Sequence, residues 1–319
     1  MWVAAVARYS DRAPRPLPDE TFVDSASAQP IAAQPGRTQV LLLATLALVA
    51  FAGNSLLCRV ALRHSGIDPA TFTSVRIVSG AVVLWFILRL RAGSLATSGS
   101  WLSALALFTY AIAFSFAYVS LPAGTGALLL FGAVQATMIG YGLWSGERLR
   151  GVQIVGLVCA VGGLAGLLLP GISAPPLAGS LLMLAAGIAW GIYSLRGKRA
   201  GDPVSVTAGN FVRAVPFAIV LSAVAIPWSR MDWLGIAYAV ASGAITSGLG
   251  YTIWYTALPS LKATSAATIQ LSVPVMTAIA GVLFLGEAFT PRLLIASAII
   301  LGGIALVVLS SGRASKLNR

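Results

Sequence analysis

Residues 265–309 read SAATIQLSVPVMTAIAGVLFLGEAFTPRLLIASAIILGGIALVVL, and a second copy of this stretch lies 140 positions earlier in the chain. That copy, residues 125–169, reads TGALLLFGAVQATMIGYGLWSGERLRGVQIVGLVCAVGGLAGLLL. Each copy runs an apolar segment into Gly-Glu and continues with a second apolar segment through Gly-Gly. Ten of the 45 aligned positions are identical, and the two dipeptides keep one spacing, which is harder to obtain by chance than matched Leu and Ala. The chain is therefore predicted to contain a duplicated unit.

The composition places the duplicated unit in a lipid bilayer. Hydrophobic residues make up 58% of the 319 positions and charged residues 9%, which is too apolar for a water-soluble core. A net charge of +12 would indicate nucleic acid binding in a soluble protein. Here the basic residues are scattered over short loops and tails, so no nucleic acid partner is predicted. Cys58 and Cys159 fall in different apolar segments, which gives no support for a disulfide.

Ten apolar segments follow residue 39, each of about 20 residues and long enough to cross the hydrocarbon core. They cover residues 40–59, 70–90, 101–120, 124–145, 152–169, 178–196, 205–227, 233–257, 264–285 and 293–310. Residues 1–38 mix charges, prolines and small polar residues, so they are predicted to be a disordered tail and not a signal peptide. Residues 311–319 form a second short tail. The predicted fold class is an all-α membrane protein with ten transmembrane helices.

The two copies are predicted to have opposite orientations in the membrane. Repeat 1 covers residues 39–170 and repeat 2 covers residues 177–310, with five segments each; because five is odd, the second repeat enters from the other side. Asp68-Pro69 and Asp202-Pro203 mark a looser match between the first halves, since each precedes a segment with Val-Arg. Inverted repeats place a substrate pathway at their interface near the midplane, and rocking of one repeat against the other gives alternating access.

The positive charges orient the chain. With the N-terminus inside the cell, fifteen of the 21 basic residues lie on the cytoplasmic side and four on the other, while two lie inside segments. The four are Arg59, Arg63, Arg230 and Arg292. This asymmetry predicts that both termini are cytoplasmic.

The chain lacks the residues that several functions need, among them proton coupling, nucleotide hydrolysis and intramembrane proteolysis. All nine acidic residues lie in the tail, in loops or at segment ends, and the single histidine, His64, lies in the first loop. Direct carboxylate-based proton coupling is therefore not expected. There is no G-x-x-x-x-G-K-[ST] loop for nucleotide hydrolysis, and one loop histidine argues against an intramembrane protease. The chain is not predicted to be an enzyme, and no cofactor or metal is predicted.

Three neutral amides lie inside apolar segments: Asn54, Gln135 and Gln270. An amide left unpaired in hydrocarbon costs several kcal/mol, so each must face protein or water. Either these amides line a substrate cavity, or they make hydrogen bonds that only hold the helices together. Both interpretations stay open at this point.

Aromatic residues with polar groups supply the other candidates for substrate binding. Such rings can hold a small organic solute by apolar contact while their OH and NH groups orient it; the alternative is an interfacial belt or core packing. Ser247, Tyr251 and Trp254 are spaced to share one helical face. The remaining candidates are Tyr110 and Tyr118 in segment 101–120, and Trp190 and Tyr193 in segment 178–196.

Three residues are candidates for gating. Pro274 is predicted to lie inside the ninth segment, where it would free a carbonyl near Gln270 and bend the helix. Arg76 and Arg213 are predicted to stand about a turn and a half inside their helices, one near each membrane face. They either reach toward water and loop carbonyls or meet a substrate carboxylate at the two mouths of the pathway.

The repeated Gly-Glu pairs are predicted to be structural hinges. Glycine suits the end of one helix and glutamate the positive N-terminal end of the next. The pairs are Gly146-Glu147 and Gly286-Glu287. Gly162 and Gly166, at G-x-x-x-G spacing, are predicted to serve packing or a dimer face, so the protein is expected to be a monomer or a weak homodimer.

The run GERLRGVQIVGLVCAVGGLAGLLL, its copy GEAFTPRLLIASAIILGGIALVV and the run QLSVPVMTAIAGVLFLGE resemble the drug/metabolite transporter superfamily, in its EamA-type branch of ten-helix proteins. The two Val-Arg dipeptides at Arg76 and Arg213 add to this resemblance, which covers about residues 40–310. It implies a bacterial inner-membrane exporter of metabolites, amino acids among them, with a central cavity between two EamA repeats. The small four-helix relatives use a membrane glutamate in helix one, where this chain has Asn54.

Repeat 1 departs from the pattern of the family, because Val134-Gln135 stands where repeat 2 has Pro274-Val275. A symmetric pair of proline gates is therefore not expected. The predicted function is export of small zwitterionic solutes, with amino acids as the preferred class. The alternatives are export of drugs or lipophilic cations, and a receptor or scaffold without transport.

Overall fold

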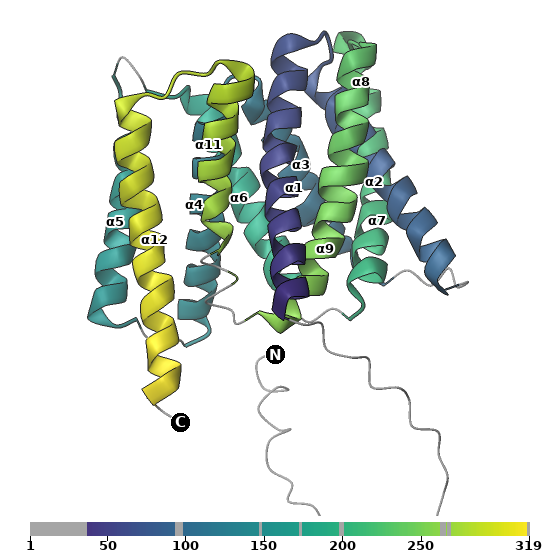
Figure 1. Ribbon diagram of the computed structural model, residues 1–319. Coiled ribbons are helices and arrows are strands. Elements are labelled where there is room, and N and C mark those ends of the chain that lie inside the picture. Colours follow the sequence, from purple (N-terminus) through teal and green to yellow (C-terminus); the bar gives the residue numbers. More distant parts are fainter. Residues whose placement is uncertain are drawn as a thin grey trace, which may run out of the picture. The chain divides into compact units, whose positions relative to one another are not determined.

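Figure 1 shows the computed structural model of the protein, which describes residues 37–92, 98–146, 149–171, 174–197, 201–261, 266 and 269–317. The helices are α1 (Arg37–His64), α2 (Pro69–Ala92), α3 (Trp101–Tyr118), α4 (Ala123–Trp144), α5 (Gly151–Leu168), α6 (Leu177–Gly197), α7 (Pro203–Ala225), α8 (Trp233–Val240), α9 (Gly250–Ala257), α11 (Ser272–Leu285) and α12 (Pro291–Leu317). A π-helix, η2 (Ala241–Leu249), joins α8 to α9, and two short 3-10 helices are η1 (Ile226–Trp228) and η3 (Leu258–Ser260). No strand occurs in these ranges.

The predicted fold class is confirmed. Within the described ranges, nine helical stretches are long and apolar enough to cross a membrane, and the shorter apolar helix α11 is the tenth. The first helix begins and the last ends on the same side of the helical layer, as an even number of crossings requires (Figure 1). The last helix runs to Leu317, beyond the predicted end at residue 310.

Contacts between the two halves follow the pairing that two inverted repeats require. Each of α2, α4 and α5 packs against the equivalent helix of the second half: α7, α11 and α12, respectively. The contact of α1 with α9 has its counterpart in the contact of α3 with α6. Figure 1 shows α12 beside α5, apart from the helices around α1. The boundaries of the two repeats stay a prediction.

The ninth segment is interrupted three residues before Pro274. Residues 269–270 are helical, the turn at Leu271 keeps helical backbone angles (φ −66°, ψ −15°), and α11 begins at Ser272. Proline has no N–H to donate to the carbonyl four residues earlier, which is that of Gln270, so an interruption at this point agrees with the prediction of a freed carbonyl. The gating role of Pro274 stays a prediction. Residues 262–265 and 267–268 lie outside the described ranges.

The Asp-Pro pairs start helices in both halves. Asp202 caps α7 through a hydrogen bond from the Ser205 backbone N–H, at 2.8 Å, and Pro203 occupies the first helical position. Asp68 precedes Pro69 of α2 and accepts hydrogen bonds from the N–H groups of Ala70 and Thr71, each at 2.9 Å. Aspartate at the N-cap accepts hydrogen bonds from the free N–H groups of the first turn, and proline at the first helical position has no N–H to leave unpaired, so the pair favours a helix start.

Asp68 also ties two loops together and should make stability depend on pH. Its second carboxylate oxygen accepts a hydrogen bond from the Arg230 N–H at 2.8 Å. Burial raises the pKa of Asp68, but hydrogen bonds from Thr71, Arg230 and Ala70 outweigh burial, so the pKa lies below its ordinary value. A depressed carboxyl pKa contributes stability above the unfolded pKa, and this contribution is lost as pH falls through the folded pKa.

Asp68→Asn is expected to cost about 1 kcal/mol at neutral pH, because the amide keeps the helix cap but its NH2 group cannot accept the Arg230 N–H. The variant should also lose less stability than the unchanged protein on acidification, because its amide does not titrate. Thermal unfolding in detergent between neutral pH and about pH 3 checks this. An equal loss of stability in both proteins over that range would contradict the role of Asp68.

Close packing of α5 on α12 depends on only one glycine of each Gly-Gly pair. A Cβ added to Gly303 would lie 2.5 Å from the carbonyl oxygen of Gly156, and one added to Gly163 would lie 2.9 Å from the Ile299 side chain. By contrast, a Cβ at Gly162 or Gly302 meets nothing within 4 Å. The second glycine of each pair therefore lets the helices approach, and the first does not.

Gly303→Val is expected to destabilise the protein by about 1–3 kcal/mol, because the added side chain forces α5 and α12 apart. Gly302→Val is the matched control, since it makes the same change on the next residue where space is open. Thermal unfolding of both variants in one detergent measures the difference. Equal melting temperatures would show that the contact does not depend on Gly303.

Candidate functional site

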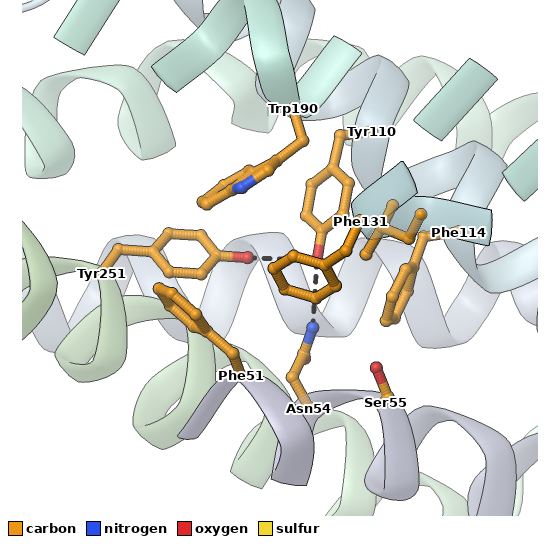
Figure 2. A pocket seen from close by; sticks show the side chains of 9 residues that line it. Phe51, Asn54, Ser55, Tyr110, Phe114, Phe131, Trp190 and Tyr251 are labelled. Atoms are coloured by element: carbon orange, nitrogen blue, oxygen red, sulfur yellow. Dashed lines mark hydrogen bonds between the residues drawn. The ribbon is translucent and has the colours of Figure 1, made fainter. Parts of the chain in front are cut away.

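A narrow cavity lies between helices of the two halves. The space between its lining atoms is about 290 Å³. The lining comes from α1, α3, α4, α6 and α9: Phe51, Asn54, Ser55, Tyr110, Phe114, Leu130, Phe131, Trp190 and Tyr251. Figure 2 shows these side chains converging on one point. The cavity is narrow, so side chains must move before it can admit a solute larger than water.

Asn54, a residue of α1 that lines the cavity, makes hydrogen bonds to α3 and η2. Its Nδ2 donates to the Tyr110 hydroxyl at 3.0 Å, and its Oδ1 accepts from the hydroxyls of Ser242 at 2.7 Å and Thr246 at 3.2 Å. Ser242 and Thr246 belong to η2, so a single amide joins α1, α3 and the second half of the chain. The two interpretations of Asn54 are therefore compatible: it lines the cavity and also holds helices together.

The aromatic rings form a continuous cluster around Trp190. The Trp190 ring lies 4.6 Å from the ring of Tyr251 and 5.0 Å from that of Tyr110, and it stacks on Tyr193 at 5.3 Å, measured between centroids. Phe51 meets Trp190 edge-on at 6.2 Å. Such contacts fix the rings and leave hydroxyl groups directed into an otherwise apolar space (Figure 2).

Arg76 lies behind the wall of this cavity. It is 1% exposed; its Nε donates to the Ser247 hydroxyl at 3.1 Å, and its Nη2 donates to the hydroxyls of Tyr110 at 3.0 Å and Tyr251 at 3.1 Å. The side chain is therefore fully buried, and its role in gating stays a prediction. A Cβ at Gly243 would lie 2.1 Å from the Arg76 carbonyl oxygen, so η2 packs tightly against α2 beside this arginine.

Arg213 has different surroundings, although it is the predicted counterpart of Arg76. Its Nη1 donates to the carbonyl oxygens of Ser98 at 3.1 Å and Gly209 at 3.0 Å. It is half-exposed and reaches a loop, as one of the two interpretations expected. The two arginines are therefore not equivalent in this conformation.

Four of the ten predicted binding residues line the cavity, namely Asn54, Tyr110, Trp190 and Tyr251. Four others lie behind them. Tyr193 stacks on Trp190, Ser247 binds Arg76, Trp254 packs edge-on against Phe51, and Tyr118 packs edge-on against Phe114. Gln135 and Gln270 are buried but do not line the cavity.

The sequence reasoning missed Phe51, Ser55, Phe114, Leu130 and Phe131. A helical spacing signal exists for some of them, because Phe51 and Ser55 lie three residues before and one residue after Asn54, and Phe114 lies four after Tyr110. Residues three or four apart share a helical face. Phe131 lies four residues before Gln135, so the same signal existed for it, whereas Leu130 has no polar residue three or four positions away.

The Gly-Glu pairs act as helix ends, and one glutamate does more. Gly146 and Gly286 have positive φ of 91° and 63°, the left-handed conformation that glycine adopts after a helix. Glu147 lies outside the described residues. Glu287 does not cap the helix that follows it: its Oε2 accepts from the Ala123 N–H at 2.7 Å, at the start of α4, and its Oε1 pairs with Arg59 Nε at 2.9 Å.

Arg59 completes this contact between the halves. It is nearly fully buried, and its Nη1 donates to the carbonyl oxygens of Tyr118 at 2.8 Å and Val119 at 3.2 Å. Glu287 comes from the second half, whereas Arg59, Tyr118 and Ala123 come from the first. The ion pair therefore fastens α1, the α3–α4 turn and the α11–α12 loop together on one side of the cavity.

Comparison with known proteins agrees with this architecture. Residues 177–309 match the EamA-like transporter family. Protein PA1977 of Pseudomonas aeruginosa, itself uncharacterized, is 54% identical over 280 residues, which are 87% of this chain and 98% of that protein. The chain belongs to the EamA-like transporter family. It is thus a multi-pass membrane transporter.

The chain is also similar to a named exporter in sequence and to a solved structure in fold. The threonine/homoserine exporter RhtA of Escherichia coli K12 is 32% identical over 174 residues, which cover 53% of this chain and 59% of the exporter. A solved crystal structure covers 86% of this EamA-family chain and 99% of its own length, with a TM-score of 0.62 at 19% identity. The latter similarity shows the fold alone.

Proposed function

We propose that this EamA-family transporter exports small amino acids across the bacterial inner membrane, with both termini in the cytoplasm. The observation that carries the proposal is the narrow cavity between the halves, in which hydroxyl and amide groups are set among aromatic rings. A small zwitterion needs both, because apolar contact holds its body and a few polar groups orient it. The similarity to a threonine/homoserine exporter over about half of the chain supports this substrate class.

The cavity suits a cationic drug less well. Lipophilic cations are usually held by a buried carboxylate, and no carboxylate is among the residues that line this cavity. Glu287 is already engaged by Arg59 and the start of α4. An amino acid is therefore the better match to the groups that are present.

The arrangement of the contacts supports alternating access. The central cavity is narrow, and on one side the pair Arg59–Glu287 joins the two halves. Opening toward that side requires the pair to separate as one half rocks against the other. Opening toward the opposite side can leave it intact. The pair is thus a latch that distinguishes the two open states.

Transport is expected to proceed without a pH gradient, because no carboxylate or histidine lines the cavity to carry a proton. The test is uptake of labelled threonine into liposomes containing the purified protein, with and without an imposed pH gradient. Initial rates should agree within about twofold, since only a titrating site in the membrane would couple them. Uptake that disappears when the gradient is abolished would reject uncoupled transport.

A further inference from the structure

The guanidinium of Arg76 is a buried cation with unused donors. Its Nε and Nη2 groups donate to Ser247, Tyr110 and Tyr251, all of them neutral hydroxyls. Its Nη1 is buried and has no hydrogen-bond partner among the described residues. The one ion pair found in the described part of the chain is Arg59–Glu287, so no carboxylate there neutralises Arg76.

This arrangement is costly unless an anion completes it. Arginine stays protonated in proteins, so it cannot lower the cost of burial by losing its charge. Stacking offsets part of the cost, because the Arg76 Cζ lies 5.0 Å from the ring centroids of both Tyr110 and Phe114. Stacking does not occupy the Nη1 hydrogens. One of them and one Nη2 hydrogen, freed when a tyrosine hydroxyl leaves Nη2, form the pair of parallel N–H donors that binds a carboxylate.

The free donor lies next to the cavity. Tyr110, Phe114 and Tyr251 contact Arg76 on one side and line the cavity on the other. These three residues therefore connect the guanidinium to the lining of the cavity, and their movement would bring the two closer together.

We propose that Arg76 binds the carboxylate of the transported solute, with Tyr110 and Tyr251 moving from the guanidinium to the solute as it enters. The inference rests on the proposed function and specifies its substrate class: small molecules with a free carboxylate. It implies that amides of the same molecules are rejected. A purely structural Arg76 would cross-link α2, α3 and α9 and would have no effect on this selectivity.

The test compares ligand-induced thermal stabilisation of the purified full chain in detergent. The probes are L-threonine, L-threoninamide and L-lactate at equal concentrations, where threonine and lactate carry the carboxylate and threoninamide does not. The variants are Arg76→Gln, which removes the charge, and Arg76→Lys, which keeps it with a different geometry. Arg89→Gln is the matched control, because Arg89 is an exposed arginine of the same helix.

Threonine is expected to raise the melting temperature of the unchanged protein and of the Arg89→Gln protein, whereas threoninamide is not. Arg76→Gln should need at least about tenfold more threonine for the same shift, because a buried charged hydrogen-bond partner is lost. Arg76→Lys should fall between the two. Equal shifts with threonine and threoninamide, or an unaltered threonine response in Arg76→Gln, would overturn the proposal.

Lactate separates this inference from the proposed function. If lactate stabilises the protein through Arg76 but threonine does not, the carboxylate site stands and amino acids are the wrong substrates. If neither carboxylate stabilises the unchanged protein, the Arg76 site is rejected, while threonine flux in liposomes would still support the proposed function. The comparison of carboxylate with amide needs no variant, so it holds even where Arg76→Gln fails to fold.

Discussion

Glu287→Ala is expected to destabilise the protein by about 3–5 kcal/mol, the cost of leaving one partner of a buried ion pair without the other. The side chains of Arg59 and Glu287 are only 4% and 12% exposed, so water cannot replace the lost partner. The substitution also leaves the N–H of Ala123, at the start of α4, without its acceptor. Both losses act on the contact between the two halves.

Thermal unfolding in detergent measures this effect, and the chain offers a matched control. Arg63 lies one turn after Arg59 on the same helix and is exposed, so Arg63→Ala should change stability by less than about 0.5 kcal/mol. The double variant Arg59→Ala/Glu287→Ala should be less destabilised than the two single effects added together, because no charge remains buried alone. A melting temperature of Glu287→Ala equal to that of Arg63→Ala would contradict the latch.

Trp190→Ala is expected to reduce threonine transport by more than about tenfold, because removal of a buried tryptophan leaves a void that its neighbours do not refill. The ring contacts Tyr110, Tyr251, Tyr193 and Phe51 at the centre of the cluster. Without it, the tyrosine hydroxyls lose the packing that fixes their positions. Trp190→Phe should retain part of the transport rate.

The control for this prediction is Trp233→Ala, since Trp233 is 87% exposed at the start of α8. Transport rates per reconstituted molecule, taken only from protein that elutes as a single species, separate a cavity effect from unfolding. If Trp190→Ala transports as fast as Trp233→Ala, the cavity is not the pathway. Loss of flux in Trp190→Ala alone would also exclude a receptor or scaffold without transport.

The number and order of the helices could be predicted from the sequence, because each helix corresponds to an apolar segment of membrane-spanning length and many of these segments end near Pro or Gly. The duplicated Gly-Glu pairs likewise marked helix ends, and the glycines have the expected left-handed conformation. The interruption before α11 could be anticipated, because Pro274 cannot donate to the Gln270 carbonyl. The π-helix η2 was missed, because its apolar segment contains no proline that marks a change in the helix.

The rotation of each helix was harder to predict than its position in the chain. In a membrane, the face toward lipid and the face toward protein are both apolar, so periodicity does not tell them apart. Asn54 and Tyr110 could be identified because their polar groups must find partners. Phe114 and Phe131 carry no such group and were missed. The burial of Arg76 depends on tertiary packing around α2, including that of η2. A local sequence pattern does not reveal such packing.

Counterflow tests the central claim most directly. Liposomes containing the purified protein are loaded with unlabelled threonine and diluted into a trace of labelled threonine at equal pH on both sides. A carrier with an alternating cavity should accumulate the label transiently above its outside concentration, and Trp190→Ala should not. If none of a panel of small amino acids gives accumulation beyond that of protein-free liposomes, the protein is not an amino-acid transporter.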